Sequence, residues 1–190
     1  MTDKKKRRMK RTEVYKAKAG DESRIAALSV KLWPDLSKEA LAGEFAAFLK
    51  SDESAVFLAK EDGKDIGFAH CQLRQEYVEG TESSPVGYLE GIFVEEAAQR
   101  RGIGRTLVSV CEQWAVQKGC REFASDCELD NTESLQFHLG VGFAEANRLI
   151  CFAKRLPNEP ENRAYHGQEE KTDANRNKTA LFAGDDGAGF

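Results

Sequence analysis

The chain has 190 residues, of which 41% are hydrophobic and 32% charged, which is enough for one domain of ordinary size and hardly enough for two. Its formal net charge of -4 is unevenly distributed, because residues 1–11 hold seven Lys or Arg against one Asp, whereas residues 12–156 sum to -7 and residues 157–190 to -3. An acidic body argues against a nucleic-acid partner, and without an apolar stretch of roughly 20 residues or a signal segment we expect no membrane partner and a cytoplasmic location.

The first predicted elements follow a basic arm at residues 1–11, which shows no apolar periodicity and is expected to be disordered. A strand is predicted over residues 14–17. The next element is a helix that ends near Trp33, because Pro34 excludes the residue before it from the helical region. A second helix is predicted over residues 37–50, where apolar residues recur at helical spacing.

Strands follow. Residues 55–60 and 66–74 flank an Asp-Gly pair, which is a strong signal for a hairpin. After a polar loop over residues 75–85, a further strand at 87–94 is apolar on both faces except at Glu90. Such a strand is usually central in its sheet. An acid within it requires an explanation, because a buried charge without a partner is costly.

A turn with two glycines connects this strand to a helix that ends at Gly119; it reads Gln99-Arg100-Arg101-Gly102-Ile103-Gly104-Arg105. A turn of this kind presents free backbone N–H groups at a helix N-terminus, where an anion such as phosphate binds. The spacing differs from that of a nucleotide-hydrolysing P-loop. Taken alone, the turn is better interpreted as an ordinary strand-to-helix connection.

The last predicted elements are a strand over residues 121–127, a helix over 131–139, and a closing pair of strands at 144–148 and 149–154. This element order predicts an α/β fold in layers, built on a single mixed sheet. Residues 157–190 form a polar extension. Its apolar residues offer a contact for a neighbouring surface or another subunit: Leu181, Phe182 and Phe190.

The five cysteines are odd in number, and no two of them form a C-x-x-C pair. This pattern indicates neither a disulfide framework nor a zinc site. We expect reduced thiols that are mostly buried. No metal site is predicted.

Two motifs resemble those of the GCN5-related N-acetyltransferase (GNAT) superfamily: the 99–104 turn after a strand, and Asn131-x6-His138-x3-Gly142-Phe143. Further strings resemble aminoglycoside 6'-N-acetyltransferases. They are Leu32-Trp33-Pro34, Tyr77-Val78-x-Gly80, Ser83-Ser84-Pro85-Val86, Leu89-Glu90-Gly91-Ile92-Phe93-Val94 and Lys118-Gly119-Cys120-Arg121-Glu122-x-Ala124-Ser125-Asp126. Together they cover residues 12–156, the predicted acetyltransferase domain.

The resemblance implies a mostly antiparallel sheet, flanked by helices, whose central strands splay apart to admit acetyl-CoA. The implied reaction moves the acetyl group directly to the 6'-amino group of an aminoglycoside within a ternary complex, which confers resistance; the family is commonly dimeric. It also implies the residues that contact the cosubstrate: Ile92, Phe93, Val94, Gln99, Arg100, Arg101, Gly102, Ile103, Gly104, Arg105, Asn131 and His138.

Acetyl transfer needs a general base, because an ammonium group has no lone pair with which to attack. The resemblance assigns the catalytic positions to Glu90 on the central strand and Asp126 at the end of the next one. Glu90 could instead be a buried carboxylate that pairs with a neighbour in the sheet. Asp126 could instead cap the helix that follows it.

Residues implied to bind the polycationic substrate are Trp33, Tyr77, Glu79, Glu82 and Asp126. The aromatic side chains would pack on the sugar rings, and the carboxylates would attract the ammonium groups. A simpler interpretation is that Trp33 leads into the core and that the glutamates belong to a solvated loop.

The sequence departs from the family at two positions. His138 stands where most members have the tyrosine that protonates the leaving thiolate, and Asn147 stands where related enzymes have an acid. A histidine could replace the tyrosine as the acid, or it could only pack against CoA. Two alternative functions stay open: acetylation of another amine, such as a polyamine or a protein N-terminus, and a CoA-binding module without catalysis.

Overall fold

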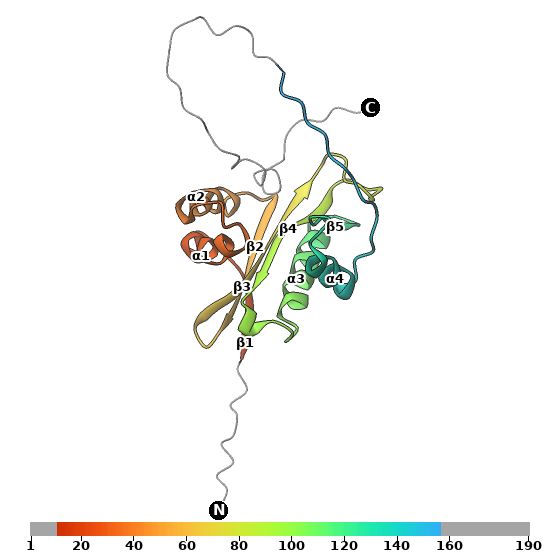
Figure 1. Ribbon diagram of the computed structural model, residues 1–190. Coiled ribbons are helices and arrows are strands. Elements are labelled where there is room, and N and C mark those ends of the chain that lie inside the picture. Colours follow the sequence, from red (N-terminus) through yellow and green to blue (C-terminus); the bar gives the residue numbers. More distant parts are fainter. Residues whose placement is uncertain (1–10, 157–190) are drawn as a thin grey trace, which may run out of the picture.

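The computed structural model describes residues 11–156. A single five-stranded sheet with the order β1-β2-β3-β4-β5 forms its centre (Figure 1). The first four strands pair antiparallel, and the last pairs parallel with β4. The strands are β1 (Thr12–Lys16), β2 (Ser54–Glu61), β3 (Lys64–Arg74), β4 (Val86–Val94) and β5 (Phe123–Ser125). The mixed, mostly antiparallel sheet confirms the predicted fold class.

Helices cover both faces of the sheet (Figure 1). On one face α1 (Glu22–Leu32) and α2 (Lys38–Phe48) enclose a core that includes Ile25, Leu41 and Phe45. The other face packs against α3 (Ile103–Gln117), and α4 (Thr132–Val141) lies beside it; a short 3-10 helix, Glu96–Ala98, precedes α3. The two cores hold β3 and β4 rigidly between them, which fixes the position of the groups these strands carry.

Local sequence signals account for most element boundaries. The α1 helix stops at Leu32, before the Trp33-Pro34 pair, and Ser37 caps α2 by accepting a hydrogen bond from the amide of Ala40 at 3.1 Å. Asp62 and Gly63 both have positive φ, at 48° and 85°, as the tight turn of the predicted hairpin requires. These predictions from the sequence are therefore confirmed.

The C-terminal part of the domain differs from the prediction. Strand β5 covers three residues instead of 121–127, and the predicted closing strands at 144–148 and 149–154 are absent from the described residues, where the chain runs without regular structure. A strand needs a hydrogen-bonding partner, and the three residues of β5 offer a short edge. Residues 144–154 also lack the glycine-containing turn that closes a tight hairpin.

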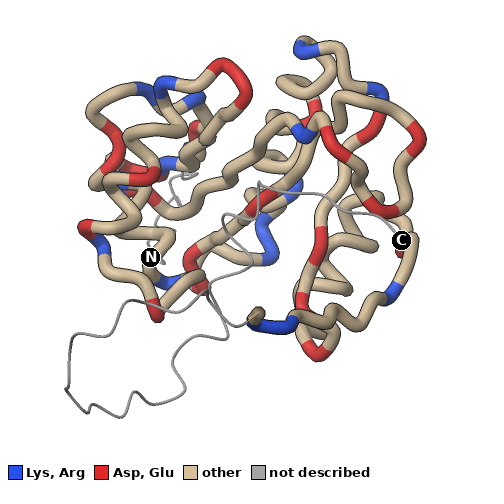
Figure 2. The backbone as a smooth tube through the Cα atoms, turned by 90° about the horizontal axis from the view of Figure 1, so that it is seen from above, with Lys and Arg blue, Asp and Glu red and all other residues tan. Residues whose placement is uncertain are grey.

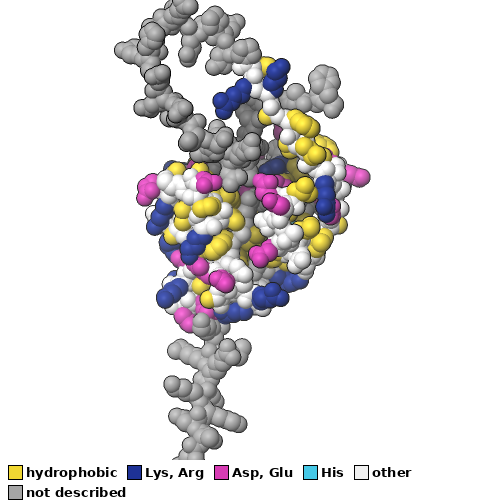
Figure 3. All heavy atoms as spheres, viewed as in Figure 1, with side chains coloured by type: hydrophobic (Ala, Val, Ile, Leu, Met, Phe, Trp, Pro, Cys, Tyr) yellow, Lys and Arg dark blue, Asp and Glu magenta, His cyan; other side chains and the backbone are white. Residues whose placement is uncertain are grey.

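The segment after α4 exposes large apolar side chains instead of burying them (Figure 3). Their exposed fractions are 61% for Leu149, 78% for Ile150, 92% for Phe152 and 75% for Leu156. The predicted basic arm up to residue 10 and the predicted extension at 157–190, with Leu181, Phe182 and Phe190, lie outside the described residues. The domain boundaries drawn from the sequence stay predictions.

Charged residues of both signs are distributed along the chain, as the coloured backbone in Figure 2 shows from above. Cys71, Cys111 and Cys120 are buried free thiols, whereas Cys127 and Cys151 are exposed. Over residues 11–156 no helix is long and apolar enough to cross a membrane, and no three His, Cys, Asp or Glu side chains gather in a way that could hold a metal ion.

Candidate active site

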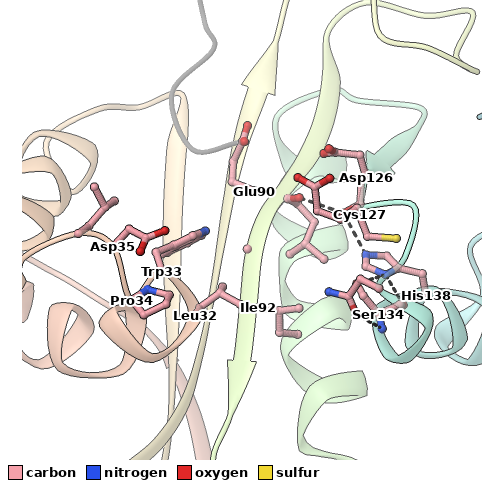
Figure 4. A pocket seen from close by; sticks show the side chains of 16 residues that line it. Leu32, Trp33, Pro34, Asp35, Glu90, Ile92, Asp126, Cys127, Ser134 and His138 are labelled. Carbon is pink, nitrogen blue, oxygen red and sulfur yellow. Dashed lines mark hydrogen bonds between the residues drawn. The ribbon is translucent and has the colours of Figure 1, made fainter. Parts of the chain in front are cut away.

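A pocket opens where β4 and β5 separate. The two strands pair only from Gly87 opposite Phe123 to Leu89 opposite Ser125, and then diverge. Beyond that point the floor of the pocket is β4, one wall is the turn after α1, and the other wall is the chain after β5 together with α4 (Figure 4). Of the predicted site residues, six line this pocket: Trp33, Glu90, Ile92, Asp126, Asn131 and His138.

Glu90 occupies a β-bulge in the floor. Leu89 lies opposite Cys71 of β3 and Gly91 lies opposite His70, so Glu90 is an additional residue without a partner in the ladder. A bulge redirects a side chain and commonly occurs next to active sites. The Glu90 side chain is only 5% exposed, yet its carboxylate lines the pocket. The bulge thus displaces the acid from the regular ladder of this apolar strand.

Arg74 at the end of β3 satisfies the Glu90 carboxylate. Its guanidinium donates from Nε to Oε1 at 3.2 Å and from Nη2 to Oε2 at 3.0 Å, a two-pronged ion pair. Burial raises the pKa of Glu90, whereas the hydrogen bonds and charge of Arg74 lower it. Glu90 is therefore paired with a neighbour in the sheet and also faces the pocket, so the two interpretations from the sequence are compatible.

Asp126 does not cap the next helix. Asn131 does so, because its side-chain oxygen accepts a hydrogen bond from the amide of Ser134 at 3.0 Å. The Oδ1 atom of Asp126 instead accepts a hydrogen bond from the hydroxyl of Tyr88 on β4. The Arg74 guanidinium carbon lies 3.3 Å from the centre of the Tyr88 ring. One chain of contacts thus joins both predicted catalytic acids across the pocket.

Arg74 and Tyr88 were not among the predicted site residues. The sequence did contain signals for both residues. Tyr88 lies two positions before Glu90 in an otherwise apolar strand, and Arg74 ends the preceding strand. Two further pocket acids, Asp35 after α1 and Glu128 before α4, also escaped the prediction. Sequence spacing could not place these residues together, since they come from four separate elements.

The predicted anion-binding turn lies at the start of α3. Arg100 and Gly102 have positive φ, at 56° and 83°, and turn the backbone so that the helix begins at Ile103. Gln99 donates to the carbonyl of Val94 at 3.0 Å, and the Arg101 guanidinium pairs with the carboxylate of Glu61 on β2. The first N–H groups of α3 have no partner within the helix and are oriented for an anion.

Two residues of this turn serve packing as well. The Ile103 side chain is buried in the core, which leaves its backbone for a ligand. A side chain at Gly104 would lie 2.8 Å from the Phe137 ring, so this glycine is required where α4 packs on α3. On the outer side Arg105 donates to the carbonyl of Gly140, which connects the same two helices.

The strand edge between this turn and the pocket is free of a strand partner within the described residues. Ile92, Phe93 and Val94 pair with β3 on one side only, because β5 ends at Ser125. The edge can therefore accept an extended ligand, in the manner of an added strand.

His138 lies on the wall opposite Glu90. Its Nδ1 is 2.7 Å from the carbonyl oxygen of Ser134, an acceptor, so this nitrogen carries a hydrogen. The other ring nitrogen, Nε2, is 3.0 Å from the hydroxyl of Ser125. The ring is thus held in one orientation at the edge of the pocket.

The predicted substrate residues are divided between two places. The Trp33 ring packs over β4, where a side chain at Gly91 would come within 2.6 Å of it. Tyr77, Glu79 and Glu82 lie instead in the loop before β4, outside the Glu90 pocket. There Tyr77 and Asn147 each donate to the Glu79 carboxylate at 2.7 Å, and these bonds lower the pKa of Glu79.

The pocket is acidic. Its lining includes four carboxylates and, among the described residues, no lysine or arginine; the four are Asp35, Glu90, Asp126 and Glu128. A concave site with one sign of charge concentrates ligands of the opposite sign. The arrangement is suited to bind a cation next to a carboxylate that can take up a proton.

Comparisons with known proteins agree with this geometry. Residues 23–143 match the model of the Acetyltransferase (GNAT) family. The chain is 41% identical over 128 residues to an aminoglycoside N(6')-acetyltransferase type 1 of Salmonella typhimurium, which covers 67% of this chain and 88% of that protein. It is 40% identical over 148 residues to the Stenotrophomonas maltophilia protein of the same name, and the match covers 77% of this chain and 94% of that protein.

Solved structures are similar as well. The structure of AAC(6')-Iy with the bisubstrate analogue CoA-S-monomethyl-acetylneamine has a TM-score of 0.74 and 36% identity, covering 77% of this chain and 99% of that one. AAC(6')-Ih from Acinetobacter baumannii has a TM-score of 0.73 and 36% identity, covering 77% and 100%. The fold, the splayed central strands and these relatives lead to one conclusion: this chain belongs to the GNAT family of acetyltransferases.

Proposed function

We propose that this protein transfers the acetyl group of acetyl-CoA to the 6'-amino group of aminoglycoside antibiotics and thereby confers resistance. The observation that carries the proposal is the acidic pocket at the divergence of β4 and β5, which the free edge of β4 connects to the anion-binding start of α3. The relatives that share about 40% of their residues with this chain bear the name of this activity.

Acetyl-CoA would bind along that edge. Its pyrophosphate would accept hydrogen bonds from the backbone amides of the turn at residues 99–105. Its pantetheine arm would extend beside Ile92, Phe93 and Val94. The side-chain oxygen of Asn131 is used by the helix cap, so its amide nitrogen is the group that would donate to the arm. This path brings the thioester next to Glu90.

The substrate would bind through charge and ring contacts. The four pocket carboxylates would attract its ammonium groups, and Trp33 on one wall would contact a sugar ring. Tyr77, Glu79 and Glu82 would contact rings that extend beyond the pocket. Asn147 holds Glu79 by a neutral amide where relatives would have a further acid, so one ammonium contact is replaced by a hydrogen bond.

The reaction is a direct acyl transfer. Glu90, directly or through water, takes a proton from the 6'-ammonium group, with Asp126 holding the amine. The amine nitrogen then attacks the thioester carbon, and a backbone N–H of β4 stabilises the developing oxyanion. As the C–S bond breaks, the nitrogen loses its second proton to His138. The leaving thiolate accepts a proton from the same ring, so the products are the amide and CoA with a free thiol.

The test is release of that thiol. Purified protein with acetyl-CoA and kanamycin or tobramycin is expected to release CoA and to yield a singly acetylated drug by mass spectrometry. Paromomycin, which carries a 6'-hydroxyl, serves as the matched control and should react far more slowly. Thiol release with spermidine but with no aminoglycoside would replace the proposal by a polyamine acetyltransferase. CoA binding without any turnover would indicate a binding module.

We also propose a homodimer in the cytoplasm. The exposed apolar side chains at residues 149–156 form the type of surface that a second copy of the chain would cover. All five cysteines are free, as in a reducing compartment. Light scattering after size exclusion should give twice the chain mass, and Phe152→Glu should yield monomers. The mass of a chain truncated after Leu156 shows whether residues 157–190 contribute to the dimer. A monomeric full-length protein would contradict the dimer.

A further inference from the structure

Arg74 contacts both sides of the proposed chemistry without lining the pocket. Its two donors engage both oxygens of Glu90. Its guanidinium also stacks on Tyr88, whose hydroxyl donates to Asp126. A single cation therefore fixes the carboxylate of the floor directly and the carboxylate of the wall through one aromatic ring.

The position of Arg74 follows from the register of the sheet. It is the last residue of β3 and lies opposite Val86, while the bulge displaces Glu90 from the regular ladder. A carboxylate that is redirected by a bulge needs a partner, because burial without one favours the neutral acid. The fork of Arg74 provides that partner at two points and so determines the orientation of the carboxylate plane.

The ion pair with Arg74 leaves Glu90 able to take up a proton. A carboxylate has about four lone-pair sites on its two oxygens, and the fork of Arg74 uses one on each. The remaining sites are available on the pocket side, where the residue lines the cavity. Orientation by Arg74 and proton uptake by Glu90 are therefore compatible.

We propose that Arg74 is a positioning residue of the acetyl transfer: it holds Glu90 as an oriented carboxylate and, through Tyr88, sets the place of Asp126. The inference rests on the proposed function, since it assigns Arg74 to the same reaction. It predicts that the protonation of Glu90, and with it the acid limb of the pH profile, depends on Arg74.

The sign of the effect follows from the groups around Glu90. Burial raises its pKa, the neighbouring charge of Asp126 raises it further, and Arg74 alone among the named causes lowers it. The other titratable groups that face it across the pocket are Asp35, Cys127, Glu128 and His138, and Tyr88 lies beside it on β4. Without Arg74 the pKa of Glu90 rises, and the base is protonated at a pH where the wild type is active.

The experiment is the pH profile of kcat/KM for Arg74→Gln, followed by thiol release with a dithiodipyridine. The acid limb should move upward by about one unit or more, so that the variant loses more activity at the acid end of the profile than at the alkaline end. Arg74→Lys keeps the charge without the two-pronged hydrogen bond, so the acid limb of this variant should lie between those of the wild type and Arg74→Gln. A limb that coincides with that of the wild type, with activity lowered equally at every pH, would overturn the proposal.

The matched control is Arg24→Gln. Arg24 makes the same kind of fork, with Nε 2.9 Å from Oδ2 of Asp65, at the opposite end of β3 from Arg74. Arg24→Gln should alter stability and leave the acid limb in place. An acid limb that moves as far in Arg24→Gln as in Arg74→Gln would also overturn the proposal.

A second readout does not require turnover. The carboxyl carbon of Glu90 in protein labelled with ¹³C-glutamate, assigned by the loss of its signal in Glu90→Gln, reports its protonation directly. Its midpoint should rise in Arg74→Gln, and an unchanged midpoint contradicts the role of Arg74. If the wild type acetylates no aminoglycoside, the proposed function fails, whereas this titration still decides whether Arg74 controls Glu90.

Discussion

The two sides of the cleft differ in how tightly they are packed. On the β3–β4 side, the first four residues of β4 are buried and both cores pack against the strands. On the opposite side β5 has three residues, α4 has no buried residue, and the segment after it exposes its apolar side chains. Groups that need fixed geometry, Glu90 and the free edge at Ile92, belong to the well-packed side. The opposite side therefore has less buried apolar surface to fix its position.

The largest expected effect concerns the chemistry of the well-packed side. Glu90→Gln removes the proposed base and should lower kcat/KM by about 10²–10⁴-fold, the usual contribution of general-base catalysis. Thiol release measures the rate, and calorimetric titration with CoA should show unchanged affinity, because the turn at residues 99–105 is untouched. A variant that retains more than half of the activity would exclude Glu90 as the base.

The second prediction compares the packing of the two sides through one type of substitution. Leu41 is fully buried between α2 and the sheet, whereas Leu139 on α4 is 49% exposed. Leu41→Ala should cost about 2–5 kcal/mol in the free energy of unfolding, from lost burial and a cavity, whereas Leu139→Ala should stay within about 0.5 kcal/mol. Urea denaturation measures both. Equal losses would show that the two sides are packed alike.

The smallest effect concerns the connection between the well-packed side and the cosubstrate. The Glu61 carboxylate, 5% exposed at the end of β2, pairs with Arg101 of the predicted anion-binding turn. Glu61→Gln removes this charge pair, so the turn is less preorganised and CoA affinity should fall about threefold to tenfold. Glu145→Gln, which breaks the exposed pair with Arg148, is the control. The same CoA dissociation constant in all three proteins would contradict this tether.

Much of the fold could be predicted because its signals are local. Pro34 ends α1, the Asp62-Gly63 pair makes the hairpin, and the apolar run around Glu90 identifies a strand in the interior of the sheet. The closing strands could not be predicted in this way. An apolar segment such as residues 149–154 becomes a strand only when an edge accepts it, and the availability of an edge is a property of the whole sheet.

The site residues also divide into those that a local motif identifies and those that only the fold brings together. The family resemblance, the predicted anion-binding turn and the two candidate acids Glu90 and Asp126 can be identified from residue order alone, because each belongs to a contiguous motif. The fold is needed to show that Glu90 lies in a bulge and lines the pocket, and that Arg74 and Tyr88 connect it to Asp126. It also shows that Tyr77 and Glu79, which contact each other, lie outside that pocket. The physical reason is that charge pairing and burial depend on distances between elements, which residue order along one strand does not specify.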